Sequence, residues 1–241
     1  GYAMRIDMTD HARHDRAHCM CPGLFRPLKR GERKKAKLDI TYDYGDEEWH
    51  FWGPEPLGAD DMRVLQGIVS LTVPNGLVLK AAPKSEKGKK LRHRLEPKWK
   101  AMICDASVVE TSFYRLLKVC GWKNDNRKRK QVFKNLKRMS AVTVFLSFRK
   151  ESWSMSLLSF HVDEETGEVG IALNWRLAAV VFGLELPCAI ISLVEARQLK
   201  SDPTRVLHQW LSAYVSLGKK QQVRLNKLIP HVWPDERDFG T

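Results

Sequence analysis

The sequence predicts an α+β fold made of tandem winged-helix (helix-turn-helix) domains. Two observations carry this prediction. Residues 111–138 contain two helical patterns separated by a short polar turn, and the second pattern is strongly basic. Residues 141–173 then alternate apolar and polar side chains, as strands do, with a polar turn at 163–167. Helix, turn, basic helix and β-ribbon is the order of a winged helix.

Composition points to a globular protein with a polyanionic partner. The chain of 241 residues suffices for one large domain or two small ones, and its hydrophobic content of 43% supports buried cores. The formal net charge of +13 favours nucleic acid over a lipid surface, because no long basic amphipathic helix carries exposed bulky apolar residues. No apolar run approaches a membrane span, and the N-terminus lacks a secretory signal pattern. We therefore expect a cytoplasmic protein that binds double-stranded DNA and no membrane.

The cysteines do not suggest a disulfide framework. There are five, an odd number with irregular spacing, so reduced thiols are expected. One short segment gathers side chains of the kind that bind zinc, namely His11, His14, His18, Cys19 and Cys21. No second pair of ligands follows at zinc-finger spacing. We therefore interpret the segment as a histidine-rich arm and expect neither a metal nor a cofactor.

A basic arm and a β-hairpin are expected first. Residues 1–35 are polar and basic, which predicts an extended arm along the DNA backbone. Its expected DNA contacts are Arg30, Arg33 and Lys34. Residues 37–44 and 48–52 alternate in polarity around a Gly-Asp turn and predict a β-hairpin.

A helix and a second basic segment follow the hairpin. Residues 60–72 carry apolar side chains at helical spacing, and Pro74 and Gly76 end the pattern. Residues 80–100 then hold nine Lys and Arg residues against two Glu, with Trp99 among them. Such a segment can bind phosphate groups. Its expected DNA contacts are Lys89, Lys90, Arg92 and Arg94.

The pattern at 127–138 is the most basic helix of the chain, with seven cations and no acid. Its apolar residues fall on one side and its cations on the other, so one side is expected to pack and the other to meet phosphate. The expected phosphate contacts are Arg127, Lys128, Lys130, Lys134, Lys137 and Arg138. Gln131 and Asn135 lie one turn apart, and their amides suit an adenine edge in the major groove. The alternative is a charged helix face that only contacts solvent.

A β-ribbon and a partial second unit are predicted after the basic helix. The ribbon comprises strands at 141–148, 153–162 and 168–173, with a wing loop at Arg149 and Lys150 beside the DNA. An apolar helix at 174–182 closes this unit. The second unit is predicted to contain strands at 189–193 and 221–225 and helices at 194–200, 202–215 and 226–233. The predicted domains are thus 1–58 (basic arm and hairpin), 59–184 (first winged helix) and 185–241 (partial second winged helix).

One family signal is long and specific. It lies in residues 13–19, 22–34, 37–46 and 53–67, with looser matches at 95–99, 207–209 and 232–234. These stretches resemble the RepC-type replication initiators of IncQ-like broad-host-range plasmids. The resemblance implies a bacterial protein whose two winged-helix domains bind direct repeats, called iterons, at a plasmid origin.

The same resemblance implies partners and one difference. The neighbouring AT-rich duplex would be opened, a plasmid-encoded helicase and primase would be recruited, and a homodimer could form through the first winged-helix domain. In the family a basic recognition helix follows the Trp233-Pro234 motif, whereas this sequence ends at Thr241. The second winged helix is therefore expected to be truncated before its recognition helix.

Two other function classes are weighed against an initiator. A winged-helix transcriptional regulator or autorepressor would bind DNA through the same features, and the residues leave this alternative open. An enzyme is not expected, because the sequence has no His-hydrophobe-His triplet near a tyrosine, no phosphate loop ending in Lys-Ser or Lys-Thr, and no clustered carboxylates. The acids at 163–165 are interpreted as a solvated turn.

Overall fold

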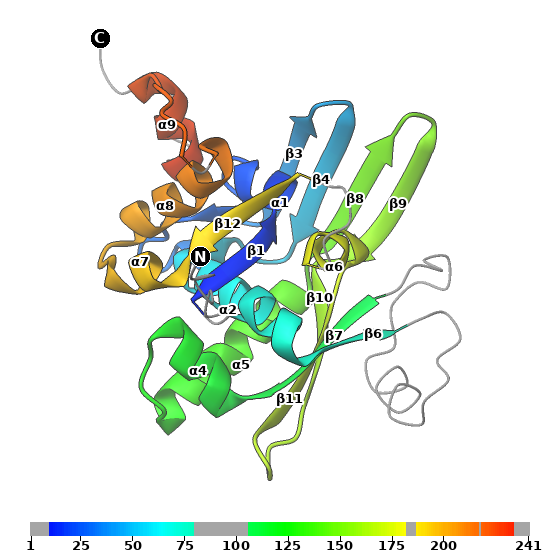
Figure 1. Cartoon of the computed structure of the whole chain (residues 1–241), viewed down its shortest axis with the longest axis vertical. Helices are drawn as coiled ribbons and strands as arrows, with labels where there is room; N and C mark the ends of the chain where they lie inside the picture. Colours follow the sequence, from blue (N-terminus) through cyan, green and yellow to red (C-terminus); the bar gives the residue numbers. More distant parts are fainter. Residues whose placement is uncertain (1–9, 80–105, 182–186, 217, 234–241) are drawn as a thin grey trace, which may run out of the picture.

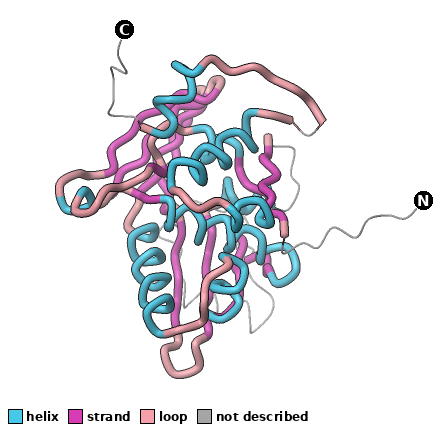
Figure 2. The backbone as a smooth tube through the Cα atoms, turned by 90° about the vertical axis from the view of Figure 1, so that its left-hand side faces the viewer, coloured by secondary structure: helices cyan, strands magenta, loops and turns pink. Residues whose placement is uncertain are grey.

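The structure, a computed structural model, describes residues 10–79, 106–181, 187–216 and 218–233. These residues form a mixed α+β fold with several small sheets around the central helix α2 (Ala59–Asn75) (Figure 1). Met62, Leu65 and Ile68 of α2 have at most 1% of their surface exposed, so this helix supplies much of the core. The predicted helix at 60–72 is confirmed. Figure 2 shows the helices gathered around the middle of the molecule and flanked by strands.

The predicted hairpin is confirmed and lies in a larger sheet. β3 (Leu38–Tyr44) and β4 (Glu47–Gly53) pair antiparallel, and β8 (Thr143–Phe148) and β9 (Glu151–Ser156) extend the sheet in the order β3-β4-β8-β9. Side chains of β4 and β8 alternate between the core and the outer face, as the pleat requires.

The strands after the basic helix do not form the single ribbon that the sequence predicts. β10 (Leu158–Val162) and β11 (Glu168–Leu173) leave the hairpin sheet and join β6 (Gly76–Leu79) and β7 (Ala106–Ser112) in the order β10-β11-β7-β6. The chain changes sheets at Leu157–Leu158. Both leucines are buried, and two consecutive buried side chains cannot lie on the same face of one strand.

The two helices of the predicted helix-turn-helix are confirmed, and a side chain caps the N-terminus of each. α4 (Phe113–Cys120) begins at Ser112, whose hydroxyl accepts a hydrogen bond from the backbone N–H of Arg115, and ends at Gly121 with φ of 73°. α5 (Asn126–Ser140) begins after Asp125, whose carboxylate accepts a hydrogen bond of 2.8 Å from the Lys128 backbone N–H.

The hairpin beside the basic helix is β10–β11, not the one that carries Arg149 and Lys150. Phe133 of α5 packs edge-to-face on Phe160 of β10, with ring centroids 5.8 Å apart. The turn before β11 reaches the start of α4, where the Phe113 backbone N–H donates to the Gly167 carbonyl at 3.1 Å. The β8–β9 turn lies at the opposite end of the molecule from α5 (Figure 1). The prediction of a wing at Arg149 and Lys150 is therefore wrong.

The predicted extended arm is wrong for the described part of the N-terminus. β1 (His11–Asp15) pairs antiparallel with β12 (Cys188–Ser192), and α1 (Arg16–Met20) follows at once. Ala12 and Ala17 are fully buried. The segment looked like a solvated arm because its packing residues are small and lie between cations and histidines.

The chain then continues through short elements. β2 (Phe25–Arg26) pairs in parallel with β5 (Leu57–Gly58), just before α2, and the single-turn helix η1 (Glu32–Lys34) lies between the two strands in sequence. Leu24 and Leu57 are fully buried, so this segment also belongs to the core.

Most of the predicted C-terminal elements are present. The helices are α6 (Trp175–Val181), α7 (Leu193–Gln198), α8 (Asp202–Tyr214) and α9 (Leu225–Val232). The strand predicted at 221–225 is wrong, because residues 221–224 have no regular structure and are mostly exposed, with no neighbouring strand to pair with. α8 packs against α1, α2 and β12. The domain boundaries at 58 and 184 stay a prediction.

Candidate nucleic-acid interface

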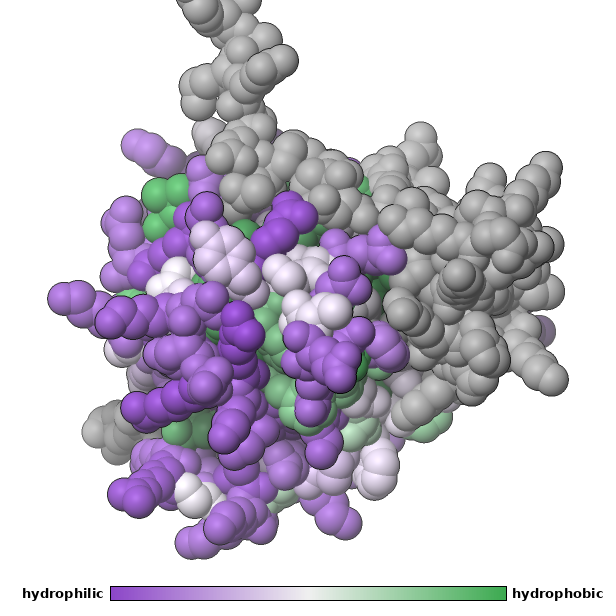
Figure 3. All heavy atoms as spheres, turned by 90° about the horizontal axis from the view of Figure 1, so that it is seen from below, coloured by the Kyte–Doolittle hydropathy of each residue, from purple (hydrophilic) through white to green (hydrophobic). Residues whose placement is uncertain are grey.

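The helix α5 has the two faces that its sequence predicts. Val132, Leu136 and Met139 are fully buried against the core. The exposed cations on the other side are Arg127, Lys130, Lys134 and Lys137. The end of the molecule that carries α4, α5 and the β10–β11 turn is covered largely by hydrophilic side chains (Figure 3). This face is therefore positive and open to a large anionic ligand.

An open groove of about 560 Å³ runs along this face. Its lining includes Arg127, Lys130, Lys134 and Arg138, with Gln131 and Asp60 between the cations. The half-buried Lys128 turns partly inward, since its ammonium donates to the Gln131 side-chain oxygen at 3.1 Å and lies 5.0 Å from the centre of the Trp122 ring. Arg63 of α2 also lies over that ring, with its guanidinium carbon 4.8 Å from the ring centre, so Trp122 packs against two cations.

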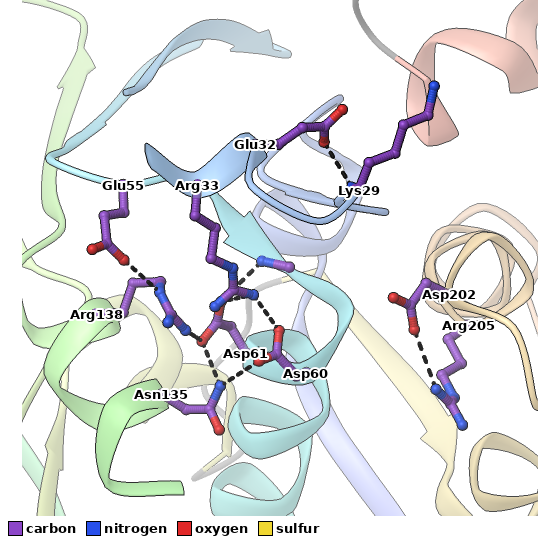
Figure 4. Close-up of polar contacts among 11 residues, drawn as sticks. Lys29, Glu32, Arg33, Glu55, Asp60, Asp61, Asn135, Arg138, Asp202 and Arg205 are labelled. Atoms are coloured by element: carbon purple, nitrogen blue, oxygen red, sulfur yellow. Dashed lines mark hydrogen bonds and ion pairs between the residues drawn. The ribbon is translucent and has the colours of Figure 1, made fainter. Parts of the chain in front are cut away.

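The carboxylates of Asp60 and Asp61, at the start of α2, bind side chains of the basic helix α5 (Figure 4). The Asn135 amide donates to Asp60 at 2.9 Å and to Asp61 at 2.8 Å. Arg138 donates to the same Asp61 oxygen as Asn135, Oδ1, at 2.7 Å, and to a Glu55 oxygen at 2.8 Å. These bonds join α5 to the N-terminal turn of α2 and to the segment that precedes it.

The same carboxylates hold the N-terminal segment. Arg33 donates to both Asp60 and Asp61, and Asp61 also accepts the backbone N–H of Gly58 at 2.9 Å. Burial and the adjacent Asp60 charge raise the pKa of Asp61. The pKa of Asp60 is lowered. Burial alone would raise it, but the positive charge of Arg33 and the hydrogen bond from Asn135 outweigh burial.

This carboxylate cluster corrects two expectations. Asn135 is completely buried and its amide nitrogen is bound to carboxylates, so its side chain is not available to read a base edge. Arg138 and Arg33 are charge-paired inside the protein, with 12% and 26% of their side chains exposed, so they are poorly placed for phosphate. Asp60 and Asp61 lie in the first turn of a helix, where acidic residues are favourable, and nothing local to them indicates that α5 lies beside them.

The remaining predicted contacts divide into three groups. Arg30 and Lys34 are exposed beside η1. Lys89, Lys90, Arg92 and Arg94, with Trp99, lie outside the described residues. Gln131 lies half-buried in the groove between the exposed cations of α5, which makes it the amide best placed to reach a base edge.

The side chains that could bind a metal are dispersed in the described part of the chain. There, no group of three or more His, Cys, Asp or Glu side chains is placed to hold a metal ion. His18 instead binds the Asp15 carboxylate at 2.6 Å, and both side chains are fully buried. None of the helices described for this chain is both long enough and apolar enough to cross a membrane.

Comparisons with known proteins place the chain in a family. Among solved structures, it is similar to a crystal structure of selenomethionine derivatives of domains 2 and 3 of RctB, with a TM-score of 0.44 and 12% sequence identity, over 80% of this chain and 68% of that one. No curated protein matches the chain. The family model for replication protein C (RepC) matches residues 6–239, nearly the whole sequence. The chain therefore belongs to the RepC family of replication proteins, the plasmid initiators that its N-terminal motifs predict.

Proposed function

We propose that this chain is an origin-binding initiator of plasmid replication that has no enzymatic activity of its own and binds iteron repeats in double-stranded DNA. The observation that carries the proposal is the exposed basic face of α5, in a member of the RepC family. Arg127, Lys130 and Lys134 would neutralise phosphates along one groove wall, which supplies affinity without sequence information. Gln131, between them, would supply the base contact.

A winged-helix arrangement is part of this proposal. α2, α4 and α5 form the helical part, and β10–β11 would serve as the wing. This assignment is supported by the Phe133–Phe160 contact and by the hydrogen bond that ties Gly167 to the start of α4. Opening of the neighbouring duplex, recruitment of a plasmid helicase and primase, and a homodimer through this unit follow from the family resemblance alone.

Anisotropy measurements with an iteron duplex and a scrambled duplex test the DNA-binding part. Lys134→Ala should weaken binding to both duplexes alike and lower the salt slope by about one over roughly 50 to 200 mM salt. Gln131→Ala should weaken binding to the iteron only, by about 1–3 kcal/mol. Arg149→Ala, on the distant β8–β9 turn, serves as the control and should change neither the affinity for the two duplexes nor the salt slope. If both α5 variants act equally on both duplexes, α5 positions the protein but does not read sequence.

The initiator part needs a separate measurement, because a transcriptional regulator would share these contacts. Permanganate reactivity of thymines beside the iterons should rise when the chain binds a supercoiled origin plasmid. A regulator would leave those thymines unreactive. The same plasmid, incubated with magnesium, should stay un-nicked, and a nicked product would instead indicate strand-cleaving activity.

A further inference from the structure

The outer face of the β3-β4-β8-β9 sheet carries large aromatic side chains exposed to solvent. Trp52 of β4 and Phe145 of β8 have 42% and 41% of their surface exposed. The inner face of the same strands is buried, with Trp49, Phe51 and Val144 fully covered. Exposed apolar side chains that gather on one face often mark an interaction site, whereas single ones are common.

The aromatic side chains lie at neighbouring positions of one sheet face. His50 lies opposite Phe145 in the strand register, and their rings stack with centroids 5.4 Å apart and an angle of 26° between planes. Trp52 is two residues along β4 from His50 and diagonal to Phe145, within reach for side chains of this length. The His50 ring is fixed from the other side by a 2.7 Å contact with Asp39. The patch is thus held in place before any partner arrives.

The charge of this face is opposite to that of the chain. Its outward positions carry exposed carboxylates on β3 and β4, namely Asp39, Asp43 and Glu48. None of the outward positions on these four described strands is Lys or Arg, although the chain as a whole has a net charge of +13. The rest of the face is made of Ser and Thr. Aromatic rings on a sheet can stack on nucleobases, but carboxylates beside them repel the phosphates of a nucleic acid.

The face is also separate from the DNA interface. The free ends of β3–β4 and β8–β9 point to one end of the molecule, and α4 and α5 lie at the other (Figure 1). None of the residues that line the α5 groove belongs to the four strands of this sheet. A ligand on the sheet face would therefore leave the basic face of α5 open to DNA.

We propose that this sheet face docks a Lys- and Arg-rich segment of a partner protein. Its cations would pair with Asp43 and Glu48 and lie over the rings of Trp52 and Phe145, where cation–π attraction adds to the burial of apolar surface. The acids give preference for a basic partner and the rings supply the central anchors. This proposal does not depend on α5 reading sequence.

Photo-cross-linking in cells tests the surface. Phe145 is replaced by the photo-reactive residue p-benzoylphenylalanine in bacteria that carry the plasmid encoding the chain. This choice of cells rests on the proposed function. We expect a cross-link to one partner protein whose cross-linked peptide, identified by mass spectrometry, is rich in Lys and Arg. Adding Asp43→Lys and Glu48→Lys should lower its yield about tenfold, because like charges then face each other. The control variant carries Glu164→Lys and Glu165→Lys on the exposed β10–β11 turn. It makes the same change in net charge and should leave the cross-link yield unchanged.

Several outcomes would overturn the proposal. The first is the absence of any cross-link. The second is a cross-link to DNA, to a second copy of the chain or to an acidic peptide. The third is a cross-link to a Lys- and Arg-rich peptide whose yield does not fall after the charge reversal at Asp43 and Glu48. Thermal unfolding of each purified variant shows whether the variant is folded. If the Asp43→Lys, Glu48→Lys variant is not folded, the Asp43→Asn, Glu48→Gln variant replaces it. Duplex binding by the sheet-face variants should equal that of the unsubstituted protein, so a failure of DNA binding is recognised separately.

Discussion

Two adjacent carboxylates determine where the basic helix lies. Asp60 and Asp61 receive side chains from η1 and α5, and Asp61 has no exposed surface. A buried carboxylate is stable only while its hydrogen bonds and ion pairs offset the lost hydration. Loss of one donor therefore costs more than the bond itself, and the geometry of α5 depends on residues outside that helix.

Asn135→Ala tests this structural role. The change should lower the free energy of unfolding by about 1–3 kcal/mol, because it leaves buried carboxylate oxygens without a donor. Gln131→Ala removes the same chemical group from the half-exposed groove and should change stability by no more than about 0.5 kcal/mol. Urea denaturation measures both. If Asn135→Ala leaves the midpoint unchanged but abolishes the preference for an iteron duplex, Asn135 reads a base and the cluster is incidental.

His14 gives the protein a predictable response to acid. It is fully buried on β1, and neither ring nitrogen has a hydrogen-bond partner among the described residues. Burial, together with the nearby His18, lowers its pKa from 6.5 to about 4, although Asp15 opposes this shift. Between these values the unfolded chain binds more protons at this site than the folded one. Stability should therefore fall as the pH falls from about 6.5 to about 4, by up to about 1.4 kcal/mol per pH unit.

His14→Phe isolates this effect. The variant keeps a ring in the buried position and should unfold with a weaker dependence on pH, which denaturation curves at pH 7, 6 and 5 would measure. A residual slope is expected from His231, whose pKa burial also lowers to about 4. Identical slopes in the variant and the original protein would show that His14 does not carry the acid response.

The basic helix also depends on its first turn. Asp125 caps α5 by accepting the Lys128 backbone N–H, and its negative charge opposes the positive end of the helix dipole. Asp125→Ala removes both effects, whereas Asp125→Ser removes the charge but keeps a capping oxygen. We expect the alanine variant to be less stable than the serine variant by about 1 kcal/mol and faster in amide exchange at residues 128–130. Equal stability of the two variants would mean that the cap contributes nothing.

Elements with local signals could be predicted from the sequence, and their arrangement could not. The periodicity of α5, the cap at Asp125 and the hairpin around Gly45 depend on residues a few positions apart. The burial of Asn135 depends instead on Asp60, which lies 75 positions away. Likewise, the alternation at 153–162 predicts strands but does not say that the chain changes sheets at Leu157. All the DNA contacts, those of the α5 face included, stay predictions.

The first strand of the described chain pairs with a strand that comes much later in the sequence. β1 pairs with β12 along its full length. Arg176 of α6 then binds Glu47 of β4 with two hydrogen bonds of 2.7 and 2.9 Å and Asp15 of β1 at 3.1 Å. One nearly buried guanidinium thus connects the N-terminal strand, the hairpin sheet and the segment before β12. These contacts make separate unfolding of the terminal segments unfavourable.

Cooperative unfolding of β1, β12 and α8 with the central helix α2 is therefore expected. In native-state hydrogen exchange with rising denaturant, amides of β1, β12 and α8 should reach the same opening free energy as those of α2. Ile191→Ala, which truncates a fully buried side chain of β12, should lower that free energy by about 2–5 kcal/mol, for amides of β4 as well as β12. Ile190→Ala, on the half-exposed face of the same strand, should have a smaller effect. If Ile191→Ala instead lowers protection in β12 and α8 alone, the C-terminal segment opens independently of the rest, as a separate domain would.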